Sequence, residues 1–231
     1  MTFWKILILA FSPGLFWLWF FYRKDKWEPE PKWQVAKSFL LGLLVAIPVS
    51  FLEHPFSANQ FVLVVLAAPI IEEFAKYLMV RLTSFRTAQF NEPLDGIIYA
   101  SAVALGFASI ETVSYLFVFA HTSRIYTIFI LRGLLSIPGH VLFSSMWGYA
   151  LGLAKFAPPE VAKKLIRRGL ALSMLLHALF NLLLGTPWAA LGMLILVPLM
   201  WKMANRRIRQ ASLASPFVNP ESSPATREPD N

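Results

Sequence analysis

Ionisable side chains interrupt several apolar stretches of this chain, and one stretch carries Glu72, Glu73 and Lys76 together. Glu72 and Lys76 are spaced i, i+4 and can pair on one helix face, whereas Glu73 lies about 100 degrees round the helix. An ion pair that locks helix packing explains Glu72 and Lys76, but it explains Glu73 poorly. The alternative interpretation is chemistry, because a carboxylate in an apolar setting suits general-base catalysis.

Further polar side chains occur in later apolar stretches. Glu111 can pair with Arg132, which we expect at a similar depth, and this pairing is compatible with a functional role. His140 stands in another stretch, and His177 and Asn181 are spaced i, i+4, so they share a helix face. A lone histidine on an apolar helix is usually a hydrogen-bonded packing residue. Two histidines that accompany three carboxylates favour a functional site instead.

The elements that must position these groups are membrane helices. Apolar residues make up 57% of the 231-residue chain and charged residues only 15%, whereas about 25% is typical of soluble domains. Apolar runs near 20 residues recur, and each is long enough to cross a hydrocarbon core of about 30 Å. Backbone polar groups in lipid must be satisfied within the segment, which requires helices. We therefore predict an all-α, polytopic transmembrane helix bundle.

The apolar runs predict about seven spans and a two-part organisation. Residues 1–204 form the membrane domain, and residues 205–231 form a disordered cytoplasmic tail, which is rich in Pro, Ser, Asn and Glu from about Ser212 onward. The fifth run contains Pro138-Gly139 and is either one kinked helix or a helix with a break. The predicted spans are 3–22, 35–53, 60–80, 95–119, 125–155, 169–185 and 188–204.

Charge predicts the orientation. Basic residues gather in the connections 23–34, 81–94 and 155–168 and at the start of the tail, which places the N-terminus outside and the C-terminus in the cytoplasm. This role accounts for the net charge of +8, so we expect the lipid bilayer and no nucleic acid as a partner. The absence of cysteine excludes disulfides, thiolate metal sites and a cysteine nucleophile.

The predicted depths of the polar groups converge. Counted from the span boundaries at 1.5 Å per residue, the three carboxylates and two histidines fall within roughly 12 Å of depth. Four different helices therefore deliver polar groups to the middle of one bundle. Independent packing salt bridges would not require this convergence.

Five motifs occur in order between about residues 70 and 181, and together they resemble the PrsW family of intramembrane proteases. That family belongs with the CAAX prenyl endopeptidases and bacteriocin-processing proteins. The wider group has His where this chain has Glu111, whereas the PrsW branch has Glu. The motifs are Glu72-Glu73-x-x-Lys76, Asp95-Gly96, Gly106-Phe107-Ala108-x-x-Glu111, His140 and His177-x-x-x-Asn181.

The resemblance implies hydrolysis of a peptide bond inside the bacterial inner membrane. The implied partner is a single-span membrane protein such as an anti-sigma factor, cut at site 1. Glu72 or Glu73, with Glu111, would activate a water. The oxyanion or the water would be held by the remaining site residues, which are His177 and Asn181, with His140 in either role.

A cofactor and the function class both have alternatives. We expect no cofactor, because no His-Glu-x-x-His motif is present to supply two zinc ligands from one helix turn. The alternative is zinc held by Glu73, Glu111, His140 and His177. A proton- or ion-coupled transporter is the main functional alternative, since intramembrane ionisable residues are its usual equipment. The chain shows no inverted repeat to support it. A catalytically inactive scaffold is a further functional alternative, and the intact set of polar residues argues against it.

Overall fold

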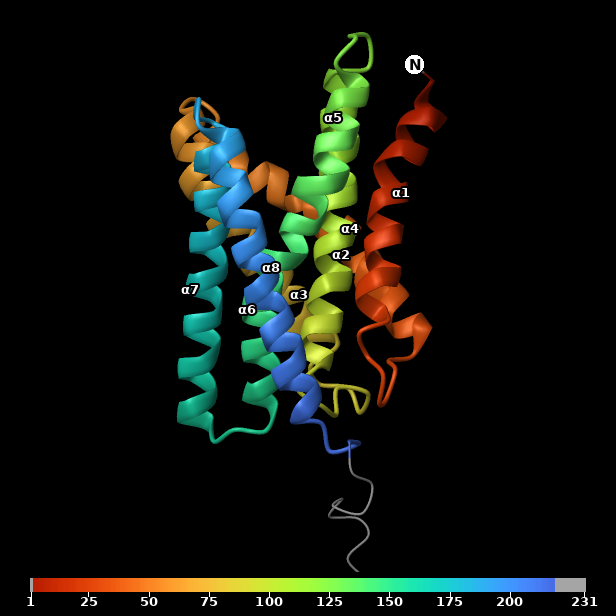
Figure 1. Ribbon diagram of the computed structural model, residues 1–231, viewed down its shortest axis with the longest axis vertical. Coiled ribbons are helices and arrows are strands. Elements are labelled where there is room, and N and C mark those ends of the chain that lie inside the picture. The colour runs from red at the N-terminus through yellow and green to blue at the C-terminus, as the bar shows by residue number, and fades with distance from the viewer. Residues whose placement is uncertain (1, 219–231) are drawn as a thin grey trace, which may run out of the picture.

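The computed structural model describes residues 2–218, and over that range it contains helices and no strands, which confirms the predicted all-α bundle. Five segments are long and apolar enough to cross a membrane: Phe3–Tyr22, Lys32–Phe56, Asp95–Val118, Ile125–Lys155 and Pro159–Leu184. The helices stand side by side along the long axis of the molecule (Figure 1). The elements are α1 (Phe3–Tyr22), α2 (Lys32–Glu53), η1 (His54–Phe56), η2 (Val62–Ala67), α3 (Ala68–Thr83), α4 (Asp95–Val118), α5 (Ile125–Leu131), η3 (Arg132–Ser136), α6 (Ile137–Lys155), α7 (Pro159–Leu184) and α8 (Ala189–Leu213).

The last two helices are longer than predicted. Helix α7 begins at Pro159 rather than at residue 169, and α8 continues to Leu213 rather than ending at residue 204. Lysine and arginine end an apolar run, but they are good helix formers, so the helices extend past the apolar layer. The predicted domain boundary between residues 204 and 205 is therefore inside a helix. Residues 219–231 of the predicted tail lie outside the described residues.

Two π-helical segments precede prolines. Segment η2 leads into α3, which has Pro69 in its first turn, and η3 leads into α6, which has Pro138 there. Proline lacks a backbone N–H and its ring collides with the preceding turn, and the wider π turn accommodates both effects. The fifth run is consequently helical from residue 125 to residue 155, with a π segment instead of a break.

Helix α4 lies at the centre of the bundle and approaches two neighbours closely. It meets α2 at Gly42 and Gly106, and it meets α6 at Gly96 and Gly148. A Cβ atom added at any of these four glycines would collide with the backbone of the partner helix. Small residues let membrane helices approach in this way. This packing holds α4, which carries Glu111, between α2 and α6, and α6 carries His140.

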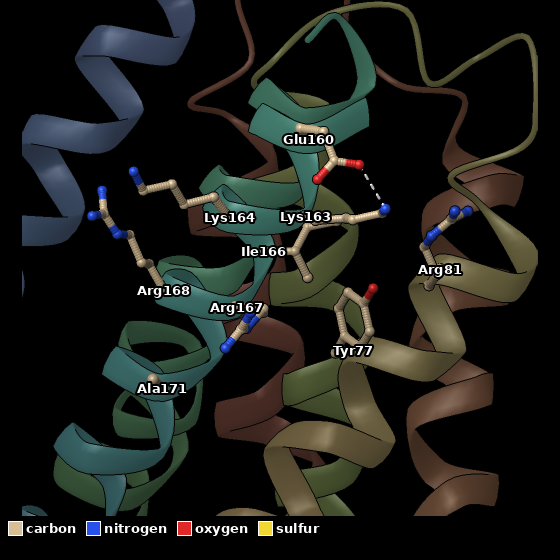
Figure 2. A pocket seen from close by; sticks show the side chains of 9 residues that line it. All are labelled: Tyr77, Arg81, Glu160, Lys163, Lys164, Ile166, Arg167, Arg168 and Ala171. Carbon is tan, nitrogen blue, oxygen red and sulfur yellow. Dashed lines mark hydrogen bonds and ion pairs between the residues drawn. The ribbon is translucent and has the colours of Figure 1, made fainter. Parts of the chain in front are cut away.

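The connections separate into two ends. The connections 23–31, 84–94 and 156–158 lie at one end with the C-terminal end of α8, and the N-terminus lies at the opposite end (Figure 1). At the first end, an open cavity of about 1000 Å³ lies between α3 and the start of α7. Figure 2 shows its basic lining, in which Lys163 pairs with Glu160 at 2.8 Å. The predicted site residues are not in this lining.

Candidate active site

Lys76 is the centre of the polar cluster on α3. Its wholly buried Nζ lies 3.0 Å from Glu72 Oε2, 2.8 Å from Glu73 Oε1 and 2.9 Å from His140 Nδ1. These three partners use all three N–H donors of the ammonium group. The expectation that an ion pair with Lys76 explains Glu73 poorly is therefore wrong. Residues three apart are helix neighbours as well as residues four apart.

His140 joins two parts of the cluster. Its Nδ1 faces Lys76, and its Nε2 lies 2.9 Å from Glu111 Oε2. An ammonium group cannot accept a hydrogen bond, so Nδ1 is the acceptor and carries no proton. Nε2 therefore carries the proton and donates a hydrogen bond to Glu111. The imidazole is fixed in one tautomer and in one orientation between α3 and α4.

Glu111 forms the predicted ion pair with Arg132. The Glu111 Oε2 atom lies 2.8 Å from a terminal guanidinium nitrogen of Arg132, and Arg132 Nε donates to Thr112 Oγ1 at 3.0 Å. The carboxylate retains 27% of its side-chain exposure, while Arg132 is buried. The pair ties α4 to η3, so Arg132 acts as a counter-charge and as a link between helices.

Glu73 is enclosed on every side. Its Oε2 accepts hydrogen bonds from Ser144 Oγ at 2.8 Å, Ser173 Oγ at 2.9 Å and Trp147 Nε1 at 3.0 Å. Its Oε1 is held by Lys76, and the residue has no exposed surface. The carboxylate thus links α3 to α6 and α7. Both of its oxygens are already occupied by protein donors.

His177 and Asn181 have different surroundings although they share a helix face. The His177 ring stacks on Phe143 at a centroid distance of 4.4 Å, and its buried Nδ1 has no hydrogen-bond partner, although Glu73 Oε1 is 3.3 Å away. Asn181 Nδ2 donates to the carbonyl of Val64 in η2 at 2.9 Å. Asn181 is therefore tied to the backbone, apart from the hydrogen-bonded cluster.

A cavity of about 690 Å³ brings most of the predicted site residues to one space. Glu73 is not in its lining, because the residue is enclosed as described above. Arg132, Tyr115 and Ser114 add polar groups to the wall. The predicted residues that line it are Glu72, Glu111, His140, His177 and Asn181.

Glu53 also lines this cavity, and sequence reasoning missed it. It is the last residue of α2, and its buried Oε1 atom has no hydrogen-bond partner. Glu53 is the last residue of the predicted second span, 35–53. The available signal was a carboxylate at the end of an apolar run, but no basic residue one helical turn before it marked it as part of a site.

The donor atoms that could hold a metal are those of Glu72, Glu73, His140 and His177, which lie within 4.8 Å of one another. The predicted zinc set contained Glu111 where this set has Glu72. Carboxylates and imidazoles are suitable zinc ligands. However, the Lys76 ammonium group lies within 3.0 Å of three of these residues, and it would repel a divalent ion there. The arrangement therefore does not fit a bound metal.

Comparison with known proteins decides the family. Residues 30–203 match the family described as PrsW family intramembrane metalloprotease, which is well over half of the chain. The chain belongs to the PrsW family. The resemblance drawn from the five motifs is thus confirmed, and the PrsW family makes the chain an intramembrane protease, a hydrolase of peptide bonds.

Curated relatives named protease PrsW agree over most of their length. The relative from Geobacillus kaustophilus (strain HTA426) is 32% identical over 214 residues, which cover 90% of this chain and 92% of the relative. The relative from Oceanobacillus iheyensis is also 32% identical, with 90% of this chain and 96% of the relative covered. The relative from Bacillus subtilis (strain 168) is 30% identical over 184 residues, with coverage of 78% and 82%. No solved structure matches the chain.

Proposed function

We propose that the chain cleaves a membrane-anchored protein with a water that Glu72 activates, without a metal ion. The observation that carries this proposal is that only one of the two adjacent carboxylates lines the cavity. Glu72 lines the cavity, and its hydrogen bond to Lys76 uses Oε2 alone. Glu73 is enclosed, with both oxygens occupied. A water in the cavity can reach Glu72 but finds Glu73 behind protein donors.

The reaction follows from this geometry. The water gives a proton to the Glu72 carboxylate while its oxygen attacks the carbonyl carbon of the peptide bond. The C–N bond then breaks, and the proton passes from Glu72 to the leaving amine. His177 lines the same cavity and stabilises the oxyanion. The Asn181 amide has a second hydrogen besides the one that Val64 accepts, and it can support that role.

The remaining charged residues hold Glu72 and the substrate space in place. Lys76 orients Glu72, and Glu73 anchors Lys76 through its own bonds to α6 and α7. Glu111 and Arg132 form the cavity wall. Three carboxylates, Glu72, Glu73 and Glu111, therefore meet two cations, which leaves one negative charge at the site. His140 connects this wall to Lys76, because its two ring nitrogens contact Glu111 and Lys76.

The proposed substrate is a single-span protein such as an anti-sigma factor, cut at site 1 in the bacterial inner membrane. The basic connections support an orientation with that end in the cytoplasm and the N-terminus outside. Glu111 and His177 each lie seven residues before the end of their helix on the N-terminal side of the bundle, which is about 10 Å of depth. With the proposed orientation, this depth supports a cut in the outer half of the membrane.

The test is cleavage of a single-span substrate in proteoliposomes. Wild type is expected to cut it in the presence of a chelator, and Glu72→Ala is expected to insert and fold but not to cut. Activity that disappears with chelator and returns with zinc would overturn the metal-free mechanism. If wild type and Glu72→Ala both leave every candidate intact and both dissipate a pH gradient, the transporter alternative replaces the protease.

A further inference from the structure

A second group of buried carboxylates lies at the basic end of the bundle, far from the cavity residues along α4. Asp25 belongs to the connection 23–31, Glu92 belongs to the connection 84–94, and Asp95 is the first residue of α4. One carboxylate oxygen from each lies within 4.8 Å of the others. Asp25 is 5% exposed, and Glu92 and Asp95 have no exposed surface. We refer to these three residues as the acidic cluster.

The acidic cluster is held in position by donors that leave other oxygens free. Asp25 Oδ2 accepts a hydrogen bond from the backbone N–H of Glu30 at 3.1 Å. Asp95 Oδ2 accepts from the backbone N–H groups of Asn91 and Glu92, both at 2.7 Å. The second oxygens, Asp25 Oδ1 and Asp95 Oδ1, are buried and have no partner. One oxygen therefore fixes each side chain and the other remains available.

Glu92 is the independent sign that something is bound here. Both of its oxygens are buried, and neither has a hydrogen-bond partner among residues 2–218. Among the described residues, no lysine, arginine or histidine forms a salt bridge with Asp25, Glu92 or Asp95. Lys155, the last residue of α6, lies at this end of the bundle, but it donates to the carbonyl of Phe85. Buried charges are normally paired or coordinate a metal, since leaving them unpaired is costly.

We propose that Asp25, Glu92 and Asp95 bind a calcium ion. Carboxylate oxygens are the ligands that hard divalent cations prefer, and Ca²⁺ binds them at about 2.3–2.6 Å. Two ligands on opposite sides of Ca²⁺ can thus be roughly 4.6–5.2 Å apart, whereas Mg²⁺ allows only about 4.0–4.2 Å. Oxygens that lie within 4.8 Å of one another can share one such cation. A set drawn from two connections and a helix end suits Ca²⁺, which accepts flexible geometry, better than Mg²⁺, which demands a near-ideal octahedron. Glu28 and Glu30 in the same connection each have a buried oxygen without a partner and are further candidate ligands.

The ion would join three parts of the chain that are distant in sequence. The connections 23–31 and 84–94 meet at the start of α4, and α4 carries Glu111 toward its other end. A bound Ca²⁺ would therefore anchor the helix that forms one wall of the protease cavity. The inference does not depend on which carboxylate activates the water, because the acidic cluster and the cavity share no residue.

The test uses the purified full-length chain in detergent after treatment with a chelator. Terbium luminescence reports binding at a site for calcium. Nearby aromatic residues excite the bound terbium, and Tyr99, which donates a hydrogen bond to Glu30, is one of them. We expect one saturable site from which Ca²⁺ displaces terbium at lower concentration than Mg²⁺. We also expect Ca²⁺ to raise the melting temperature of the protein.

Two variants locate the site. Glu92→Gln is expected to weaken terbium and calcium binding at least about tenfold, because a charged ligand is lost. In chelator it should melt at the same temperature as wild type or higher, because it removes an unpaired buried charge. Asp25→Asn is a second variant in a loop. Glu160→Gln, an exposed carboxylate, and Glu72→Gln, in the other cluster, are controls that should bind like wild type.

Three results would overturn the proposal. The first is no terbium or calcium binding by wild type at millimolar concentration, which needs no variant to interpret. The second is binding that Glu92→Gln and Asp25→Asn leave unchanged, or that Glu72→Gln abolishes. The third is displacement of terbium by Mg²⁺ at lower concentration than by Ca²⁺, which would contradict the assignment of the ion.

Discussion

The chain buries two groups of carboxylates, and they differ in their counter-charges. In the cavity group, Glu72, Glu73 and Glu111 each lie within 3.0 Å of a lysine or arginine nitrogen. Within residues 2–218, no lysine or arginine nitrogen forms a salt bridge with a carboxylate of the acidic cluster. Its carboxylates are also enclosed, whereas Glu72 and Glu111 face a cavity. The first group has two cations of its own, Lys76 and Arg132, which leave one negative charge, whereas the second forms no salt bridge among the described residues.

The electrostatics of the acidic cluster express the same contrast. Burial, and then the neighbouring charge of Glu92, raise the pKa of Asp25 to about 7. A carboxylate that loses its proton this reluctantly is poorly tolerated as an unpaired charge. The comparison therefore teaches that burial alone does not identify a catalytic carboxylate. Access to a cavity and an internal counter-charge distinguish Glu72 from Asp25.

The largest expected effect is on catalysis by Glu72. Glu72→Gln should lower the rate of substrate cleavage by about 10²–10⁴-fold, because the amide cannot accept the proton of the water. The melting temperature should stay close to that of wild type. Cleavage rates in proteoliposomes measure the effect, with Glu160→Gln as the exposed control. If Glu72→Gln still cuts and a folded Glu73→Gln does not, then the general base is Glu73.

The second prediction removes the internal cation and makes the cavity group resemble the acidic cluster. Lys76→Met should lower the free energy of unfolding by about 3–5 kcal/mol, since it leaves Glu72 and Glu73 buried without a cation. Unfolding in mixed detergent micelles measures this loss. Adding Glu73→Gln to Lys76→Met should restore part of it. Lys163→Met, at an exposed pair, should have little effect. A fully stable Lys76→Met protein would remove the basis of the comparison.

A smaller effect is expected at the edge of the cavity. Asn181→Ala removes the hydrogen bond to the carbonyl of Val64, which corresponds to about 0.5–1.5 kcal/mol of stability. The cleavage rate should fall much less than in Glu72→Gln. The measurements are unfolding in detergent and cleavage in proteoliposomes. Complete loss of cleavage by a stable Asn181→Ala protein would instead assign Asn181 a direct contact with the reacting atoms.

The smallest effect is expected for Glu53→Gln. Glu53 lines the cavity, but its buried Oε1 has no partner to lose, so the free energy of unfolding should stay equal or rise slightly. The cleavage rate should remain near that of wild type. Melting temperature and cleavage are compared with those of Glu160→Gln. A strong loss of cleavage without unfolding would show that Glu53 belongs with Glu72 among the groups that act on the substrate.

Much of the fold and part of the site could be predicted from the sequence. The lengths of the apolar runs predicted the helices, and the depths of Glu111 and Arg132 predicted their ion pair, which the structure confirms at 2.8 Å. The predicted start of α7 and the predicted end of α8 were wrong, because helix propensity continues where hydrophobicity stops. Spacing also suggested that Asn181 acts with His177, but η2 supplies a carbonyl that binds the Asn181 amide.

By itself, the sequence determined which residues enter the membrane and which helix neighbours can pair. Both properties depend on local composition and on the helical repeat, so they need no partner segment. Only the tertiary structure decided which of two adjacent carboxylates faces the cavity, because Ser144 and Ser173 come from other helices and enclose Glu73. It also brought Asp25 to Asp95. Contacts between distant segments depend on how the helices pack, and no local pattern encodes them.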